Sequence, residues 1–337
     1  MVGNQRRHTI YYFLLLPLIC GLLYRAPALM HAQDSRIAIE PRNEPKPATN
    51  GEGDRIGTRL RVDSNLVLIP VMVTDHRDRM ITGLEKDHFR LFEDKVQQVI
   101  THFATEDTPV SIALLFDCSG SMGPKMDRAR AAVREFIRSA NPEDEFALVP
   151  FADRAHLIAS FTSQPEDIQS RVMFLQPRGR TALLDAIYMA LNEMKHAKHA
   201  RKAVLIISDG GDNASRYSQR DIKKLVREAD VQIYSIGILE PMMGRMRTLE
   251  EMSGPALLDE VAHESGGRLF EVDNLNEMPD IASKIGMALR TQYILGYAPS
   301  AEKRDGKYHK VQVKIERPKG LPPLRATFRP GYVAPQN

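Results

Sequence analysis

Between Thr108 and Arg290 the sequence alternates short, almost unbroken apolar runs with amphipathic segments of helical period. Runs such as KAVLIIS and VQIYSIGI are apolar on both faces, which is typical of parallel strands covered by helices on each side. We predict strands at 110–117, 145–151, 155–161, 202–208, 231–238 and 268–272, and helices at 124–139, 165–175, 182–196, 218–229, 255–265 and 276–290. The fold class is therefore α/β, with a doubly wound, mostly parallel, Rossmann-like sheet and one antiparallel edge hairpin.

Both flanks of this region are β-rich. Residues 58–107 contain the strand-like run LVLIPVMVTD, then FRLFED and QQVITHFA joined by a turn at Asp94-Lys95. Residues 291–335 add QYILGYAP, YHKVQVKIERP and ATFRPGYVAP as three strand candidates. We expect the two flanks to pair in a small β-sandwich-like domain. Residues 33–57 are rich in Pro, Gly, Asn and charge, and are expected to form a disordered linker.

Residues 1–32 have the pattern of an export signal. Arg6 and Arg7 precede the apolar run IYYFLLLPLICGLLY, and small residues follow in APALMHAQ. The run is short for a membrane span, which favours cleavage over the alternative, an uncleaved signal anchor. Lipidation at Cys20 is disfavoured because Ile19 stands where such sites need a small residue. We therefore expect an exported protein that is periplasmic, secreted or associated with the cell envelope.

Composition narrows the classes of partner. The formal net charge is +3, from 46 basic and 43 acidic residues, and three of the basic ones lie in the signal. The rest of the chain is close to neutral and has no basic run, so nucleic-acid binding is not expected. Removal of the signal leaves Cys118 as a single thiol, which excludes an intramolecular disulfide. With no His beside it, Cys118 is expected to be a small core residue rather than a nucleophile.

Polar side chains follow the predicted strands at three places. Asp117, Ser119 and Ser121 lie in DCSGSM after the first strand, Thr181 precedes a helix, and Asp209 follows AVLIIS. In an open doubly wound sheet, loops at the carboxyl ends of the strands form the ligand site, so these three loops are expected to meet. Two carboxylates and three hydroxyls are hard oxygen donors. They favour Mg²⁺, with Mn²⁺ or Ca²⁺ possible, over zinc or copper.

DCSGSM resembles the Asp-x-Ser-x-Ser loop of von Willebrand factor A domains, the metal-ion-dependent adhesion site. Thr181 matches that family's separate threonine, Asp209 matches its Asp-Gly segment, and the likeness spans about 108–290. The resemblance also extends to exported bacterial proteins of this type. It implies that the three hydroxyls lie close to the ion and that the two carboxylates bind it directly or through water. A cation so weakly neutralised keeps an open position for a Glu or Asp of a partner protein.

Several alternatives stay open from the sequence. Ser-Gly-Ser can be a turn that caps a helix, and Thr181 taken alone is better explained as a helix cap. The domain can be a metal-independent envelope scaffold. A Mg²⁺-dependent phosphohydrolase is disfavoured because Ser119 stands where a second Asp is needed, so no enzyme activity and no small-molecule substrate are expected.

Lesser candidates lie outside these three loops. Asp212 and Asn213 are expected to be turn residues, and His196 and His199 a basic helix end rather than a metal site. The Met-rich segment 240–255 is either an adaptable contact surface or packing against a helix. A shift of helix 276–290 with ligand state is a further possibility that the sequence does not decide.

Overall fold

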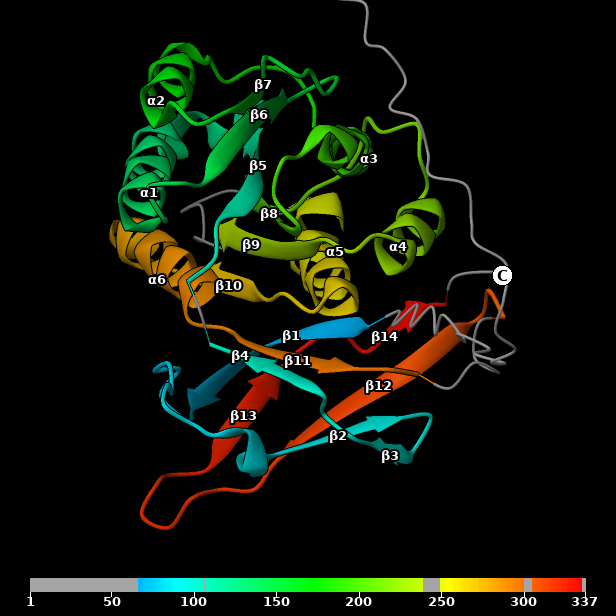
Figure 1. Ribbon diagram of the computed structural model, residues 1–337. Helices are drawn as coiled ribbons and strands as arrows, with labels where there is room; N and C mark the ends of the chain where they lie inside the picture. The colour runs from blue at the N-terminus through cyan, green and yellow to red at the C-terminus, as the bar shows by residue number, and fades with distance from the viewer. Residues whose placement is uncertain (1–65, 106, 239–248, 300–304, 335–337) are drawn as a thin grey trace, which may run out of the picture. The chain divides into compact units, whose positions relative to one another are not determined.

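The structure, a computed structural model, describes residues 66–105, 107–238, 249–299 and 305–334 (Figure 1). The described residues all belong to one compact unit. The α/β part follows the predicted alternation. Its elements are β5 (Val110–Asp117), α1 (Met126–Ser139), β6 (Glu145–Phe151), β7 (Ala159–Thr162), α2 (Pro165–Phe174), α3 (Leu183–Glu193), β8 (Arg201–Ser208), α4 (Gln219–Glu228), β9 (Gln232–Ile238), α5 (Leu249–Ser265), β10 (Leu269–Val272) and α6 (Met278–Arg290).

A six-stranded sheet in the described residues has the order β10-β9-β8-β5-β6-β7. All neighbouring strands are parallel except β6 and β7, which form the predicted antiparallel edge. Alternate residues of β5 enter different cores. Leu114 packs in the cluster with residues of α1, α2 and α6, and Leu115 in the cluster with residues of α3, α4 and α5. The predicted doubly wound architecture, with helices on both faces, is therefore confirmed (Figure 1).

Several boundaries differ from the sequence predictions. The strand expected at 155–161 is β7 at Ala159–Thr162, because the register shifts between Phe146 and Leu148 and a single bridge joins Phe151 to Ala155. The helix expected from residue 124 begins at Met126, after the 3₁₀ helix η2 (Gly120–Lys125) that contains Pro124.

The helix α5 is also longer than predicted. It begins at Leu249 although Pro255 lies inside it, so the last part of the Met-rich segment 240–255 is helical rather than loop. Residues 239–248 of that segment lie outside the described residues.

The flanks form two four-stranded sheets in the described part of the chain, ordered β13-β1-β11-β4 and β14-β12-β2-β3. Their common core contains Ile69, Leu91, Tyr293 and Val313. Antiparallel pairs β1–β11 and β2–β12 join the two ends of the sequence, which confirms the predicted pairing of the flanks. The strands are β1 (Val67–Asp75), β2 (Phe89–Glu93), β3 (Val96–Gln98), β4 (His102–Ala104), β11 (Tyr293–Tyr297), β12 (Tyr308–Ile315), β13 (Leu324–Thr327) and β14 (Gly331–Val333).

Two strand candidates of the flanks are each divided between the sheets. QQVITHFA becomes β3 and β4, and ATFRPGYVAP becomes parts of β13 and β14, with the two members of each pair in opposite sheets. Between β3 and β4 the chain crosses over, with Ile100 buried and the Thr101 amide donating to the Gly296 carbonyl at 2.8 Å. The predicted turn is confirmed: Asp94 and Lys95 have φ of 47° and 71° between β2 and β3.

His309 on β12 lies between two carboxylates. Its Nδ1 is 2.8 Å from Asp94 Oδ2, and its Nε2 is 3.1 Å from Asp305 Oδ1. Burial lowers the pKa of His309, but the hydrogen bonds to Asp94 and Asp305 outweigh burial and raise the pKa above its usual 6.5. The folded state thus holds the imidazolium more tightly than the unfolded chain does.

We expect His309→Gln to lower the free energy of unfolding more at pH 6 than at pH 9. A raised pKa stabilises the fold below about pH 6.5, and this stabilisation is lost as the pH rises through the folded-state value. Urea unfolding at the two pH values measures the effect. The exposed His156→Gln is the control. An equal loss for His309→Gln at both pH values would contradict the assigned contacts.

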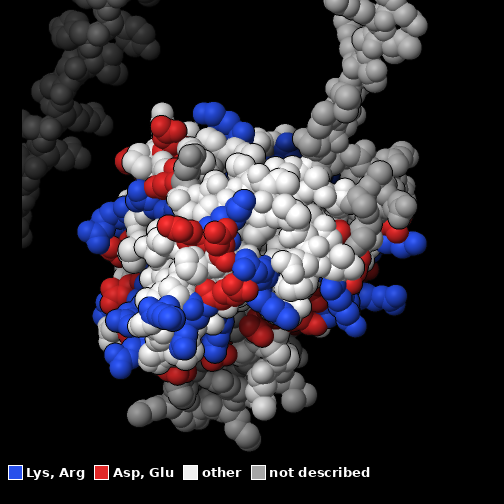
Figure 2. Space-filling view, turned by 60° about the horizontal axis from the view of Figure 1, so that its bottom comes forward, with Lys and Arg blue, Asp and Glu red and all other residues white. Residues whose placement is uncertain are grey.

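Within the described residues, no helix combines the length and apolarity needed to cross a bilayer, and the apolar run of the expected signal lies outside those residues. On the face shown in Figure 2, basic and acidic side chains are intermingled. This agrees with the near-neutral composition outside the signal.

Candidate functional site

Asp117 ends β5 and is fully buried. One carboxylate oxygen, Oδ1, accepts the Ser119 amide at 2.8 Å, and Oδ2 accepts the Ser208 hydroxyl at 2.6 Å. Ser208 is the last residue of the neighbouring strand β8. Its role escaped the sequence analysis, although its position directly before Asp209 is the signal that could have revealed it. The Asp117 side chain is therefore fixed from two strands.

Ser119 and Ser121 bring two hydroxyls together. Their Oγ atoms are 3.1 Å apart. Ser119 precedes η2 at the N-cap position, but its side chain makes no capping hydrogen bond. The serines therefore form the turn that begins η2, as the alternative expected, but the helix-cap part of that interpretation is wrong for the Ser119 side chain. Ser121 is half-buried and Gly120 is exposed, so the hydroxyl pair lies next to solvent.

Thr181 lies on a segment that is bonded to the same loop. The Gly120 amide donates to the Gly179 carbonyl at 3.0 Å, and the Arg178 amide donates to the Cys118 carbonyl at 2.7 Å. Thr181 is buried, and the residue that caps α3 is Ala182. The helix-cap explanation of Thr181 is therefore wrong as well. The structure brings the Thr181 segment against the loop that holds Ser119.

Asp209 follows β8 and is buried beside a lysine that the sequence analysis missed. Lys125 Nζ lies 2.8 Å from Asp209 Oδ2, and the two side chains are 7% and 6% exposed. Lys125 ends η2, four residues after Ser121, which is the signal that could have revealed it. The ammonium group supplies one positive charge at the place where the sequence predicts a cation.

The charged form of Asp117 is disfavoured in this environment. Burial, and then the negative charge of Asp209, raise the pKa of Asp117 to about 7. Two buried carboxylates and a pair of hydroxyls supply oxygen donors of the kind that a hard divalent cation takes, whereas the Lys125 ammonium is a competing positive charge. Cys118, next to Asp117, is buried in the core, and burial raises its thiol pKa to about 12. The prediction that Cys118 is a small core residue is confirmed.

Residues 112–211 match the family model of the von Willebrand factor type A domain. The chain contains a von Willebrand factor type A domain. The matched segment includes all three loops described above, so the resemblance drawn from the sequence motifs is confirmed at the level of the domain.

Relatives of the A domain lie at low sequence identity. An uncharacterized protein of Borreliella burgdorferi is 24% identical over 184 residues, covering 48% of this chain and 54% of that protein. Human integrin alpha-X is 24% identical over 189 residues, covering 52% of this chain and 15% of the integrin. A solved von Willebrand factor type A structure from Catenulispora acidiphila is 14% identical with a TM-score of 0.47, covering 82% of this chain and 75% of that chain. The chain thus spans about half, or much less, of the curated relatives.

The loop after Asp209 supports the A-domain site without joining it. Asp212 Oδ1 accepts the Leu184 amide at 3.2 Å, and Asn213 Oδ1 accepts the Thr181 amide at 2.9 Å. Both residues therefore have the structural roles expected for them. They hold the loop after β8 against the segment that contains Thr181.

No group of three or more His, Cys, Asp and Glu side chains is placed to hold a metal anywhere in the described part of the chain. The candidate set in the A domain has only two carboxylates, so its fit to a cation depends on the hydroxyls. His199 Nε2 is 3.1 Å from the Glu143 carbonyl, and His196 Nδ1 is 3.6 Å from Glu193. These two histidines have separate partners, as expected for a basic helix end.

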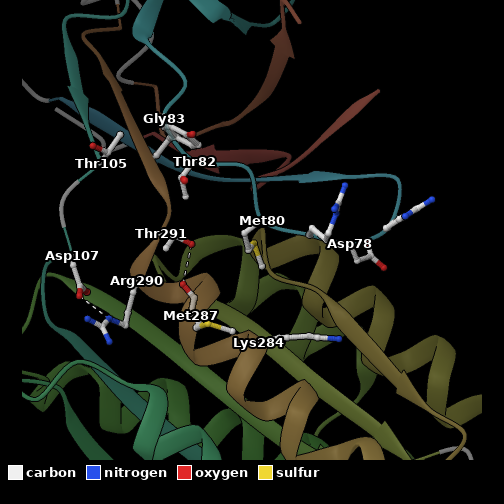
Figure 3. A pocket seen from close by; sticks show the side chains of 13 residues that line it. Asp78, Met80, Thr82, Gly83, Thr105, Asp107, Lys284, Met287, Arg290 and Thr291 are labelled. Carbon is white, nitrogen blue, oxygen red and sulfur yellow. Dashed lines mark hydrogen bonds and ion pairs between the residues drawn. The ribbon is translucent and has the colours of Figure 1, made fainter. Parts of the chain in front are cut away.

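A cavity of about 690 Å³ lies elsewhere, between α6 and the loop at residues 77–83 (Figure 3). Met80 and Met287 line it, and two of its carboxylates are held in ion pairs: Asp107 with Arg290 at 2.6 Å and Asp78 with Arg268 at 2.8 Å. Its lining lacks the carboxylate and hydroxyl set at the strand ends. The candidate metal site therefore lies apart from this cavity.

A close contact between two glycines positions the Asp209 loop. Gly210 has a φ of +90°, and a Cβ on Gly254 of α5 would lie 2.3 Å from the Gly210 carbonyl carbon. We expect Gly254→Ala to lower the free energy of unfolding by about 1–3 kcal/mol because it overpacks this contact. Urea denaturation measures the loss. Gly211→Ala, whose Cβ would meet no atom within 4 Å, is the control. An equal effect of both substitutions would contradict the packing argument.

Proposed function

We propose that the A domain is an exported protein-binding module that grips an acidic residue of a partner protein through a divalent cation, most simply Mg²⁺. Asp117, Ser119, Ser121, Thr181 and Asp209 would hold the ion. When bound, the ion supplies an electrophilic centre for a carboxylate of the partner. A periplasmic, secreted or envelope location follows from the expected signal and belongs to this proposal.

One observation carries the proposal. The loops after β5 and β8 are linked through Asp117 and Ser208, the Ser119 and Ser121 hydroxyls lie 3.1 Å apart, and the carboxylates of Asp117 and Asp209 are buried. Only one ammonium group among the described residues, that of Lys125, is bonded to these carboxylates. A divalent ion bound to this set of hard donors keeps part of its positive charge uncompensated. The ion can therefore bind a further carboxylate. The likeness to an integrin chain agrees with an interaction module.

Calorimetry with Mg²⁺ on the purified chain tests the proposal. We expect the wild type to bind Mg²⁺, and Asp117→Ala and Ser119→Ala to reduce the affinity at least tenfold because each removes an oxygen donor. Ser170→Ala, an exposed serine on α2, is the matched control. Equal Mg²⁺ affinity in all four proteins would refute the site. Absence of binding in the wild type would refute the metal-dependent function.

A metal-independent scaffold is the second candidate, and Lys125 favours it. The ammonium group already compensates the Asp209 carboxylate without an ion. In that case a partner would be captured equally in Mg²⁺ and in EDTA, and equally by Asp117→Ala. No observation favours the phosphohydrolase: Ser119 remains at the position where that chemistry needs an acid, and the lack of enzyme activity stays a prediction.

A further inference from the structure

Four exposed arginines lie on the loops that surround Thr181. They are Arg154, Arg178, Arg180 and Arg216. Within the described residues, the first three have no ion pair. Arg216 Nε lies 3.1 Å from Asp185 Oδ2, yet its side chain is 83% exposed. Asp153, Asp185 and Asp212 lie on the same segments, so the four arginines leave only a small local surplus of positive charge.

Backbone hydrogen bonds hold these arginines along one border of the candidate ion site. The Arg178 amide donates to the Cys118 carbonyl at 2.7 Å, and the Arg180 amide donates to Asp153 Oδ1 at 2.8 Å. The Ala182 amide donates to the Ala152 carbonyl at 2.8 Å, which brings the Arg154 turn to the same segment. We call these four residues the arginine border.

The Arg216 end of this border is fixed to α3. The Arg216 amide donates to Asp185 Oδ1 at 2.8 Å, and Asp185 lies in the first turn of the helix that follows Thr181. Arg216 is therefore held on the same side of the site as the three other arginines.

A cavity of about 640 Å³ adjoins the arginine border and contains two of its members, Arg154 and Arg216. Tyr188 and Tyr217 line it as a stacked pair, with ring centroids 4.1 Å apart and an angle of 21° between the rings. We call it the tyrosine pocket; Ala155, Met189 and Ala214 add apolar surface, and Asp153, Asp185 and Asn192 also line it. Tyr188 lies five residues after Leu183, the first residue of α3, which is about 8 Å along the helix at the helical rise per residue.

We propose that the partner presents an acidic segment in which an aromatic side chain lies about three residues from the acid that meets the ion. An extended chain covers about 10 Å in three residues, which is enough to reach from the start of α3 to Tyr188. Additional carboxylates of the segment are attracted by the arginine border. The apolar lining of the pocket favours a peptide side chain over a sulfated sugar. This inference rests on the proposed function and names the class of its partner.

The probe is a fluorescein-labelled heptapeptide, Glu-Glu-Glu-Gly-Gly-Tyr-Glu, measured by fluorescence anisotropy in Mg²⁺. We expect the double variant Arg154→Glu/Arg216→Glu to bind it at least tenfold more weakly than the wild type, since two attractions become repulsions. The control is Arg134→Glu/Arg317→Glu, which makes the same charge change at exposed positions of α1 and of the segment after β12. At the same salt concentration, the control should change the affinity for the peptide less than twofold.

The peptide itself is varied in a second series. Replacement of its Tyr by Gly should weaken binding to the wild type and should have little further effect in Tyr188→Ala. Replacement of its Glu residues by Gln should abolish binding. Failure of the wild type to bind the peptide, equal binding by the two double variants, or tighter binding of a heparin oligosaccharide than of the peptide would overturn the inference.

Magnesium calorimetry on the same proteins separates this inference from the proposed function. Normal Mg²⁺ binding in Arg154→Glu/Arg216→Glu with weakened peptide binding supports both. Peptide binding that depends on the arginines but is equal in Mg²⁺ and EDTA refutes the metal-dependent function and retains the acidic partner. Mg²⁺ binding with peptide affinity unaffected by the arginines refutes the inference alone.

Discussion

Lys125→Met is expected to bind Mg²⁺ at least tenfold more tightly than the wild type. In the structure the Lys125 ammonium lies 2.8 Å from Asp209 Oδ2, and both side chains are nearly buried. A cation that enters must either displace the ammonium from Asp209 or bind next to a like charge. Two unit charges 4 Å apart interact by about 4 kcal/mol near a protein surface, and a tenfold change in affinity corresponds to only about 1.4 kcal/mol.

Calorimetry with Mg²⁺ measures this gain, and Lys198→Met, which removes an exposed lysine, is the control. Methionine is chosen because it keeps most of the length of the side chain while removing the charge. Unchanged affinity in Lys125→Met would show that the ammonium does not compete with the ion. Weaker binding would show that Lys125 instead holds Asp209 in the geometry that the ion needs.

The alternation of strands and helices could be predicted because burial leaves a periodic pattern in the sequence. β5 and β8 are buried on both faces, so they appear as unbroken apolar runs, whereas β12 alternates buried and exposed residues. The division of QQVITHFA into β3 and β4 could not be predicted. Its residues suit a strand throughout, and only the tertiary structure makes the chain cross between the sheets at Ile100.

Part of the candidate site could be predicted because the carboxyl ends of parallel strands lie at one edge of the sheet, so the loops that follow these strands lie close together. Asp117 and Asp209 are brought together in this way. The hydrogen-bond and ion-pair partners of Asp117 and Asp209 depend on the directions of side chains, which a pattern of residue types does not reveal. Ser208 and Lys125 both bond to predicted site residues. Their closeness in the sequence to Asp209 and Ser121 is a signal, but it does not show that their side chains turn toward the carboxylates.

Asp209→Ala is expected to lower the free energy of unfolding by about 3–5 kcal/mol in the absence of metal, because it leaves the Lys125 ammonium buried without its counter-ion. The double variant Lys125→Met/Asp209→Ala should recover most of this loss, since it removes both buried charges together. Urea unfolding in EDTA of the wild type, the two single variants and the double variant gives the coupling energy of the pair.

The double-mutant cycle of Lys125 and Asp209 also shows how Mg²⁺ calorimetry on the Asp209 variants is to be interpreted. A loss of Mg²⁺ binding in Asp209→Ala alone can arise from local unfolding around Lys125, whereas a loss in the stable double variant reports the missing carboxylate. Additive effects of the two substitutions would contradict a buried ion pair between Lys125 and Asp209. A double variant that remains folded but binds Mg²⁺ as tightly as Lys125→Met would remove Asp209 from the candidate ligands and leave Asp117 with the hydroxyls of Ser119 and Ser121.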